Sequence, residues 1–210
     1  SFFNYKHTPQ KHTALVFKWP KLRSKQPVYI DIDFRLKTHE GFDFGTFTND
    51  VSTFTSEVCK IIGNQTTGYV ITKEDGYYKT IACENYFCVG AHVYLPSIML
   101  TKAETIKLRD NCKGLIRPIF KFDFVNTIED VLDSRIFPNR TNGLVLMGDY
   151  KNISSGGQYL PRKSITFDGE VKIEDCSLTK ELFNKLYKDL LFNEKYIMKE
   201  EKTACGGPRQ

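Results

Sequence analysis

The fold is decided by residues 27–34, which read Pro27-Val28-Tyr29-Ile30-Asp31-Ile32-Asp33-Phe34. Apolar side chains occupy every second position, and a period of two predicts a β-strand with one apolar face. The other face carries Asp31 and Asp33, whose Cα atoms lie roughly 7 Å apart in an extended strand. A buried carboxylate needs a cation or hydrogen-bond donors, so the pair indicates a site for divalent ions. The alternative is an edge strand with a solvated polar face.

Further elements follow from alternating and helical patterns along the chain. We expect helices at 46–62, 101–113, 127–132 and 178–192, strands at 68–73, 77–83, 86–95 and 144–148, a strand or extended link at 116–124, and a hairpin through Asp168-Gly169. Strands and helices mix without strict alternation, which favours the α+β class. The expected organisation is a basic N-terminal arm over 1–26, one domain over 27–200 and a flexible tail over 201–210.

Composition narrows the class of protein. The 210 residues are 40% hydrophobic and carry a net charge of +5, which suits a globular protein with a polyanionic partner or an ordinary solvated surface. No apolar run approaches the roughly 18 residues of a membrane span, so we expect no membrane partner. The six cysteines are expected to be free thiols. The alternative is a secreted, disulfide-linked glycoprotein with sequons at Asn64, Asn139 and Asn152, but no signal-peptide pattern is visible, and we expect a protein that is not secreted.

Two further motifs contain candidate functional residues. His92 lies in the apolar stretch Gly90-Ala91-His92-Val93-Tyr94-Leu95, where it is either a core histidine or a donor to a phosphate oxygen. Asp133 opens a segment in which Arg140 and Lys151 follow at distances that reach phosphate groups. The alternative for this third motif is an ordinary helix end and loop.

In this order, the three motifs resemble the archaeo-eukaryotic primase superfamily, and most closely its primase-polymerase branch, which includes primase domains of large DNA viruses. The resemblance covers about residues 14–152. It implies a mixed or antiparallel sheet flanked by helices, with residues 27–200 as the catalytic domain. It also implies that Asp31, Asp33 and Asp133 are catalytic and bind Mg²⁺ or Mn²⁺, and that the triphosphate is bound by His92, Arg140 and Lys151. The chain departs from the family pattern at Gly90, where Ser or Arg is frequent.

The activity implied by the resemblance is template-directed nucleotidyl transfer by a two-metal mechanism. The implied partners are a single-stranded DNA template, nucleoside triphosphates and a replicative helicase or other replication proteins, in the nucleus or a viral replication compartment. Template contacts are expected from basic residues and one aromatic residue, namely Lys18, Trp19, Lys21, Arg23, Arg162 and Lys163, unless these are solvated basic loops. Two other functions stay open: a metal-dependent nuclease with the same carboxylates, and a degenerate primase fold that only binds nucleic acid.

Overall fold

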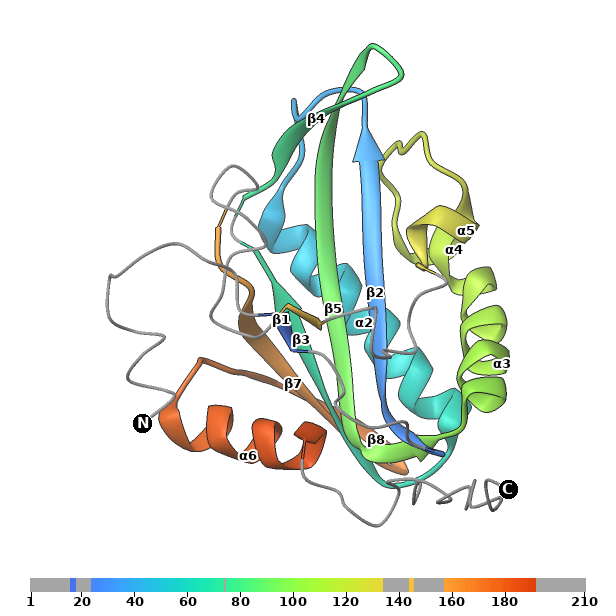
Figure 1. Ribbon diagram of the computed structural model, residues 1–210, viewed down its shortest axis with the longest axis vertical. Coiled ribbons are helices and arrows are strands. Elements are labelled where there is room, and N and C mark those ends of the chain that lie inside the picture. The colour runs from blue at the N-terminus through green and yellow to red at the C-terminus, as the bar shows by residue number, and fades with distance from the viewer. Residues whose placement is uncertain (1–15, 18–23, 74, 134–143, 146–156, 192–210) are drawn as a thin grey trace, which may run out of the picture.

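A computed structural model describes residues 16–17, 24–73, 75–133, 144–145 and 157–191, and the fold is given for these residues. The expected flexible tail and most of the expected basic arm lie outside them. A two-stranded antiparallel pair joins β1 (Val16–Phe17) to β6 (Leu144–Val145). The larger part of the fold is one antiparallel sheet with helices on both of its faces (Figure 1). This confirms the α+β class and the antiparallel sheet flanked by helices.

The main sheet has six strands. The order is β2 (Gln26–Leu36), β5 (Glu84–Leu100), β3 (Thr66–Thr72), β7 (Leu160–Asp168) and β8 (Glu170–Asp175), and β4 (Tyr77–Ile81) pairs with the outer part of β5. The long strand β5 lies beside β2 although a helix and two strands separate them in the chain (Figure 1). Two motifs that are distant in sequence are therefore neighbours.

Helices cover the sheet unevenly. The longest, α2 (Phe44–Ile62), crosses one face, and α3 (Lys102–Cys112), the short 3₁₀ turn Lys113–Leu115, α4 (Ile116–Ile119) and α5 (Ile128–Val131) follow on the β2 side (Figure 1). The opposite face is covered at one end by α6 (Lys180–Leu191). None of the helices described is long and apolar enough to cross a membrane.

The expected alternation of β2 decides which face forms the core. Val28, Ile30, Ile32 and Phe34 are buried against α2, as the period of two predicts. Phe34 is the centre of an aromatic cluster, with ring centroids 4.8 Å from Phe120 and 4.9 Å from both Phe122 and Phe124. The carboxylate-bearing face of β2 is thereby turned away from the main core.

Two local expectations hold only in part. Of the two alternatives for residues 116–124, the strand is wrong, since Ile116–Ile119 form the helical turn α4. The link alternative holds from Phe120 on: Phe120, Phe122 and Phe124 pack on Phe34 without joining the sheet. The second expectation was a strand over 77–83, but β4 ends at Ile81. The turn to β5 lies at Ala82-Cys83, because Ile81 pairs with Glu84. Both turn residues have positive φ, 49° and 68°, a conformation that usually selects Asn or Gly. The sequence therefore carries no turn signal there.

Candidate active site

The first two sequence motifs meet across one strand pair. Asp31 lies directly opposite His92, and Asp33 lies opposite Gly90, in the register of β2 and β5. The His92 Nε2 atom is 3.4 Å from Asp31 Oδ1, and the imidazole is almost fully buried while Asp31 remains partly exposed. A carboxylate next to an imidazole orients the ring.

The third carboxylate joins from the other edge of β2. Ile32 forms an isolated antiparallel bridge with Leu132, and the Asp133 amide donates to the Asp31 carbonyl at 3.3 Å. In antiparallel pairing, this register sets Asp133 opposite Asp31 and on the same face. Asp133, Asp31 and His92 therefore occupy neighbouring positions in one row across the sheet, with Asp33 one step along β2.

The segment that carries Asp133 is held by two polar side chains that sequence reasoning missed. Arg109 of α3 is buried, and its guanidinium donates to the carbonyls of Leu132 and Glu129, both at 2.7 Å. The Asn126 side chain pairs with the edge of β2 as a neighbouring strand would: it donates to the Asp33 carbonyl at 2.9 Å and accepts from the Arg35 amide at 3.0 Å. Arg109 shares the buried side of α3 with Leu108 and Cys112, and a charge among buried helix positions was the available signal.

The glycine that departs from the family pattern has a local reason. A Cβ atom at Gly90 would lie 2.6 Å from Asp33 Oδ1 and 3.0 Å from the Ile32 carbonyl oxygen. The Asp33 carboxylate therefore lies over the backbone of Gly90, in space that any other residue would fill. Glycine at position 90 therefore leaves the space that the Asp33 carboxylate, a candidate metal ligand, occupies.

Tyrosines surround the histidine. The rings of His92 and Tyr159 are stacked, with centroids 4.0 Å apart and planes 12° apart, and Tyr29 meets His92 edge to face at 5.1 Å. Burial raises the pKa of both Tyr29 and Tyr159 well above the ordinary tyrosine value, and the negative charge of Asp31 raises them further. Both phenols are therefore neutral at physiological pH. Sequence reasoning did not find Tyr159, which immediately precedes β7 and has no motif around it.

The basic residues expected to contact nucleic acid are only partly described. Lys163 of β7 forms an ion pair with Asp175 of β8 at 2.6 Å, and Arg162 lies beside it where the pairing of β3 and β7 shifts register. Neither residue belongs to the row of carboxylates on β2. The other predicted site residues lie outside the described part of the chain: Lys18, Trp19, Lys21, Arg23, Arg140 and Lys151.

The donor chemistry fits a hard divalent cation. Carboxylate oxygens are the ligands that Mg²⁺ and Mn²⁺ prefer, and the backbone sets Asp31, Asp33 and Asp133 next to one another on one face. Within residues 24–73, 75–133 and 157–186, however, no three His, Cys, Asp or Glu side chains are grouped closely enough to form a complete metal site. The three carboxylates thus provide candidate ligands without a closed set among these residues.

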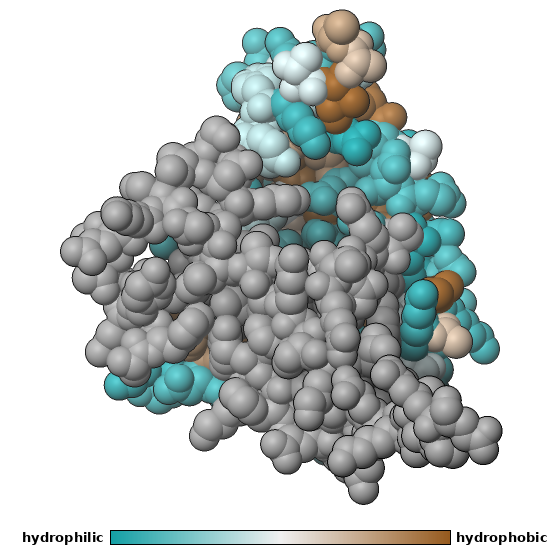
Figure 2. Space-filling model, in the orientation of Figure 1, coloured by the Kyte–Doolittle hydropathy of each residue, from teal (hydrophilic) through white to brown (hydrophobic). Residues whose placement is uncertain are grey.

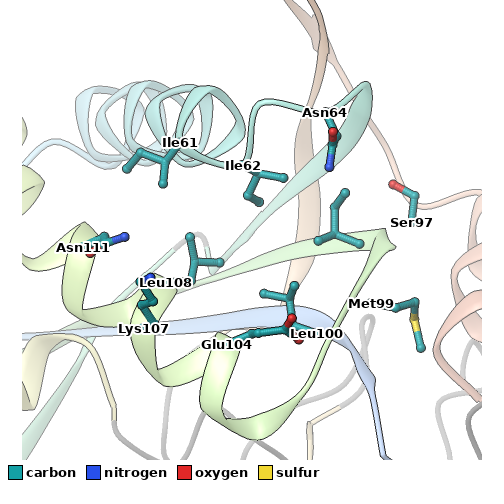
Figure 3. A pocket seen from close by; sticks show the side chains of 11 residues that line it. Ile61, Ile62, Asn64, Ser97, Met99, Leu100, Glu104, Lys107, Leu108 and Asn111 are labelled. Carbon is teal, nitrogen blue, oxygen red and sulfur yellow. The ribbon is translucent and has the colours of Figure 1, made fainter.

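Two other surface features lie apart from this row. A pocket of about 490 Å³ opens between the end of α2, the end of β5 and α3, lined by Ile61, Leu100, Leu108 and their neighbours (Figure 3). Of the predicted site residues that the structure describes, none lines it. Hydrophobic residues also gather at the tip formed by β4 and β5, while the described surface near α3 is mainly hydrophilic (Figure 2).

Comparison with known families gives one match. Residues 5–163 match the family described as "C962R protein N-terminal AEP domain", in which AEP denotes archaeo-eukaryotic primase. The matched range includes all three sequence motifs and most of the sheet, as far as the start of β7. A comparison with curated proteins finds no match.

Proposed function

Since the chain belongs to the archaeo-eukaryotic primase family, we propose that it is the catalytic domain of a DNA primase/polymerase, which adds nucleotides under the direction of a DNA template. Domains of this family are primase-like, of nucleotidyltransferase type. The observation that carries the proposal is the row of Asp133, Asp31 and His92 across three adjacent segments. This row brings carboxylates for a cation next to a donor for phosphate.

In this proposal, Asp31, Asp33 and Asp133 hold Mg²⁺ or Mn²⁺. When bound, such ions supply activation of a 3′-hydroxyl and neutralisation of the charge on the departing pyrophosphate. Two hydrogen bonds hold the backbone that carries the carboxylates: the Asp133 amide donates to the Asp31 carbonyl, and the Asn126 side chain donates to the Asp33 carbonyl. A preorganised site of this kind needs little rearrangement during the reaction.

In this scheme a ring N–H of His92 donates a hydrogen bond to a phosphate oxygen of the triphosphate. Its ring is held by Tyr159 and lies next to Asp31, so its direction is set before substrate arrives. Arg140 and Lys151 are proposed to neutralise the remaining phosphate charge. The template is proposed to run along Lys18, Trp19, Lys21, Arg23, Arg162 and Lys163, with a helicase or other replication protein as partner, in the nucleus or a viral replication compartment.

The test is nucleotide incorporation with Mn²⁺, a single-stranded DNA template and labelled nucleotides. The wild type is compared with Asp31→Ala/Asp33→Ala and with Glu170→Ala/Glu174→Ala, which removes two exposed carboxylates from β8. We expect template-dependent product from the wild type and the control, and none from the Asp31/Asp33 variant. The melting temperatures of all three proteins should agree, which shows that the loss of product is not a loss of folding.

A second arm supplies a preformed primer, which separates initiation from elongation. Product from the Asp31/Asp33 variant would contradict the assigned roles. Metal-dependent shortening of the template by the wild type, without incorporation, would instead favour the nuclease. Binding of DNA without either reaction would favour a degenerate primase fold.

A further inference from the structure

Lys73 lies beside the strand that carries His92, although no sequence motif contains it. It follows β3 directly, and the residue as a whole is 4% exposed. Lysine is almost never so deeply buried without compensation, because its ammonium group loses hydration. What surrounds the buried ammonium group therefore indicates what it can do.

Aromatic contacts connect Lys73 to His92. The Lys73 Nζ atom lies 4.8 Å from the centre of the Tyr159 ring and 5.0 Å from that of Tyr77. Tyr159 is the residue stacked on His92 at 4.0 Å. One tyrosine ring thus contacts both the ammonium of Lys73 and the imidazole of His92, and the faces of such rings attract cations.

Strand register gives the same placement independently. Ile71 of β3 lies opposite His92 and Thr72 lies opposite Ala91, so the next residue, Lys73, comes level with Gly90. Alternation along β3 turns Lys73 to the face that bears His92. The Asp33 carboxylate reaches over Gly90 from the neighbouring strand β2. Lys73 therefore completes a second row across the sheet, with Asp33 at its opposite end.

We propose that Lys73 is a second cationic residue of the polyphosphate site, acting beside His92 on the triphosphate of a nucleotide; this inference rests on the proposed function. The long flexible side chain of lysine brings a point charge to phosphate oxygens. The contribution comes from β3, whereas the family resemblance assigns phosphate contacts to the histidine strand and the third motif. In this arrangement the Tyr159 ring lies between His92 and the Lys73 ammonium and keeps the two groups apart.

The first experiment measures binding of inorganic triphosphate and of a labelled deoxynucleoside triphosphate by equilibrium dialysis in Mn²⁺. Lys73→Met removes the charge at nearly constant length, Lys73→Arg keeps it, and Lys172→Met is the control on the exposed strand β8. We expect Lys73→Met to weaken both ligands by about 10- to 100-fold, the range of one hydrogen bond to a charged group. Lys172→Met is expected to stay within about threefold of the wild type. Lys73→Arg keeps the charge and is expected to lose less affinity than Lys73→Met.

A second measurement uses the wild type and so does not depend on the folding of any variant. Pyridoxal phosphate condenses with a lysine amine, with loss of water, to an imine that borohydride reduces to a stable secondary amine. We expect mass spectrometry to find Lys73 labelled and inorganic triphosphate to protect it, while labelling of Lys172 is unaffected.

The outcomes separate this inference from the proposed function. Primer extension by the wild type together with unchanged triphosphate affinity in a folded Lys73→Met variant would overturn the role of Lys73 alone. The same holds if Lys73 is unlabelled, or labelled without protection by triphosphate. A variant that melts earlier yet binds triphosphate normally would show that Lys73 serves only as a counter-ion within the protein. Triphosphate binding that depends on Lys73, in a protein that never extends a primer, would support the anion site and count against the polymerase.

Discussion

Replacing Gly90 by alanine tests whether the position of the Asp33 carboxylate matters for function. The new Cβ would lie 2.6 Å from Asp33 Oδ1, whereas ordinary contact begins at 3.4 Å, so the carboxylate oxygen has to retreat by about 0.8 Å. Gly90 does not have a positive φ, so alanine can adopt its backbone conformation. The methyl group therefore acts by contact alone.

The expected effects on stability and on activity differ sharply. Asp33 Oδ1 is the free end of a side chain that can swing towards solvent, but the Ile32 carbonyl oxygen also lies 3.0 Å from the new Cβ and belongs to the paired strand β2, so this second contact opposes folding. Alanine restricts the unfolded chain, which favours folding by about 0.4–1 kcal/mol and offsets that cost. We expect the free energy of unfolding to change by less than about 1 kcal/mol. A displacement near 1 Å in a reacting site costs about 100-fold in rate, which corresponds to about 2.7 kcal/mol of activation free energy.

The assay is single-turnover primer extension at equal concentrations of folded protein, with urea denaturation alongside. Gly114→Ala is the control, because a Cβ there meets nothing within 4 Å. Extension by Gly90→Ala within about threefold of the wild type would refute the reasoning, since Asp33 would then tolerate displacement. A loss of stability without a loss of rate per folded molecule would refute it as well.

Three further predictions concern stability. Arg109→Met should lower the free energy of unfolding by about 2–4 kcal/mol, because buried carbonyls lose their donors; Arg109→Lys should restore part of this, and an unchanged urea midpoint would contradict it. Ala82→Asn with Cys83→Gly should raise that free energy by about 1–2 kcal/mol, since both residues have positive φ; a lower melting temperature would argue against strain in this turn. Burial raises the pKa of Cys59 to about 11 and of Cys112 to about 12. Between about pH 9 and pH 11 both thiols are therefore ionised mainly in the unfolded chain, and the free energy of unfolding should fall by up to about 1.4 kcal/mol per pH unit for each thiol; urea midpoints that are flat from pH 8 to 10 would exclude this.

The sequence predicted well where the signal is local. Alternation in residues 27–34 identified β2 and the face that carries Asp31 and Asp33, because side-chain direction in a strand depends only on position. The helical stripe of residues 46–62 located α2 to within two residues, and the expected helix at 101–113 matches α3 to within one residue at each end. The order of the motifs indicated the family before the structure placed Asp31, His92 and Asp133 in one row.

The sequence failed where a residue acts through a distant partner. Arg109, Asn126 and Tyr159 have no surrounding motif, and their roles appear only when α3, the edge of β2 and the start of β7 are brought together. Phe120, Phe122 and Phe124 alternate as a strand does, but their positions are decided by packing on Phe34. Period-two patterns report burial on one side and do not report whether a hydrogen-bonded neighbour exists.

The two-sided pairing of β2 has a consequence for the order of folding. Its neighbours on either side, β5 and the segment through Asp133, come from later parts of the chain. Loop closure over such separations is slow relative to local contacts. During synthesis the acidic strand emerges well before either neighbour, and a fragment that ends before β5 has no candidate site. The amide hydrogens that pair β2 with β5 should accordingly exchange only through large-scale unfolding, so that their protection reports the completely folded domain.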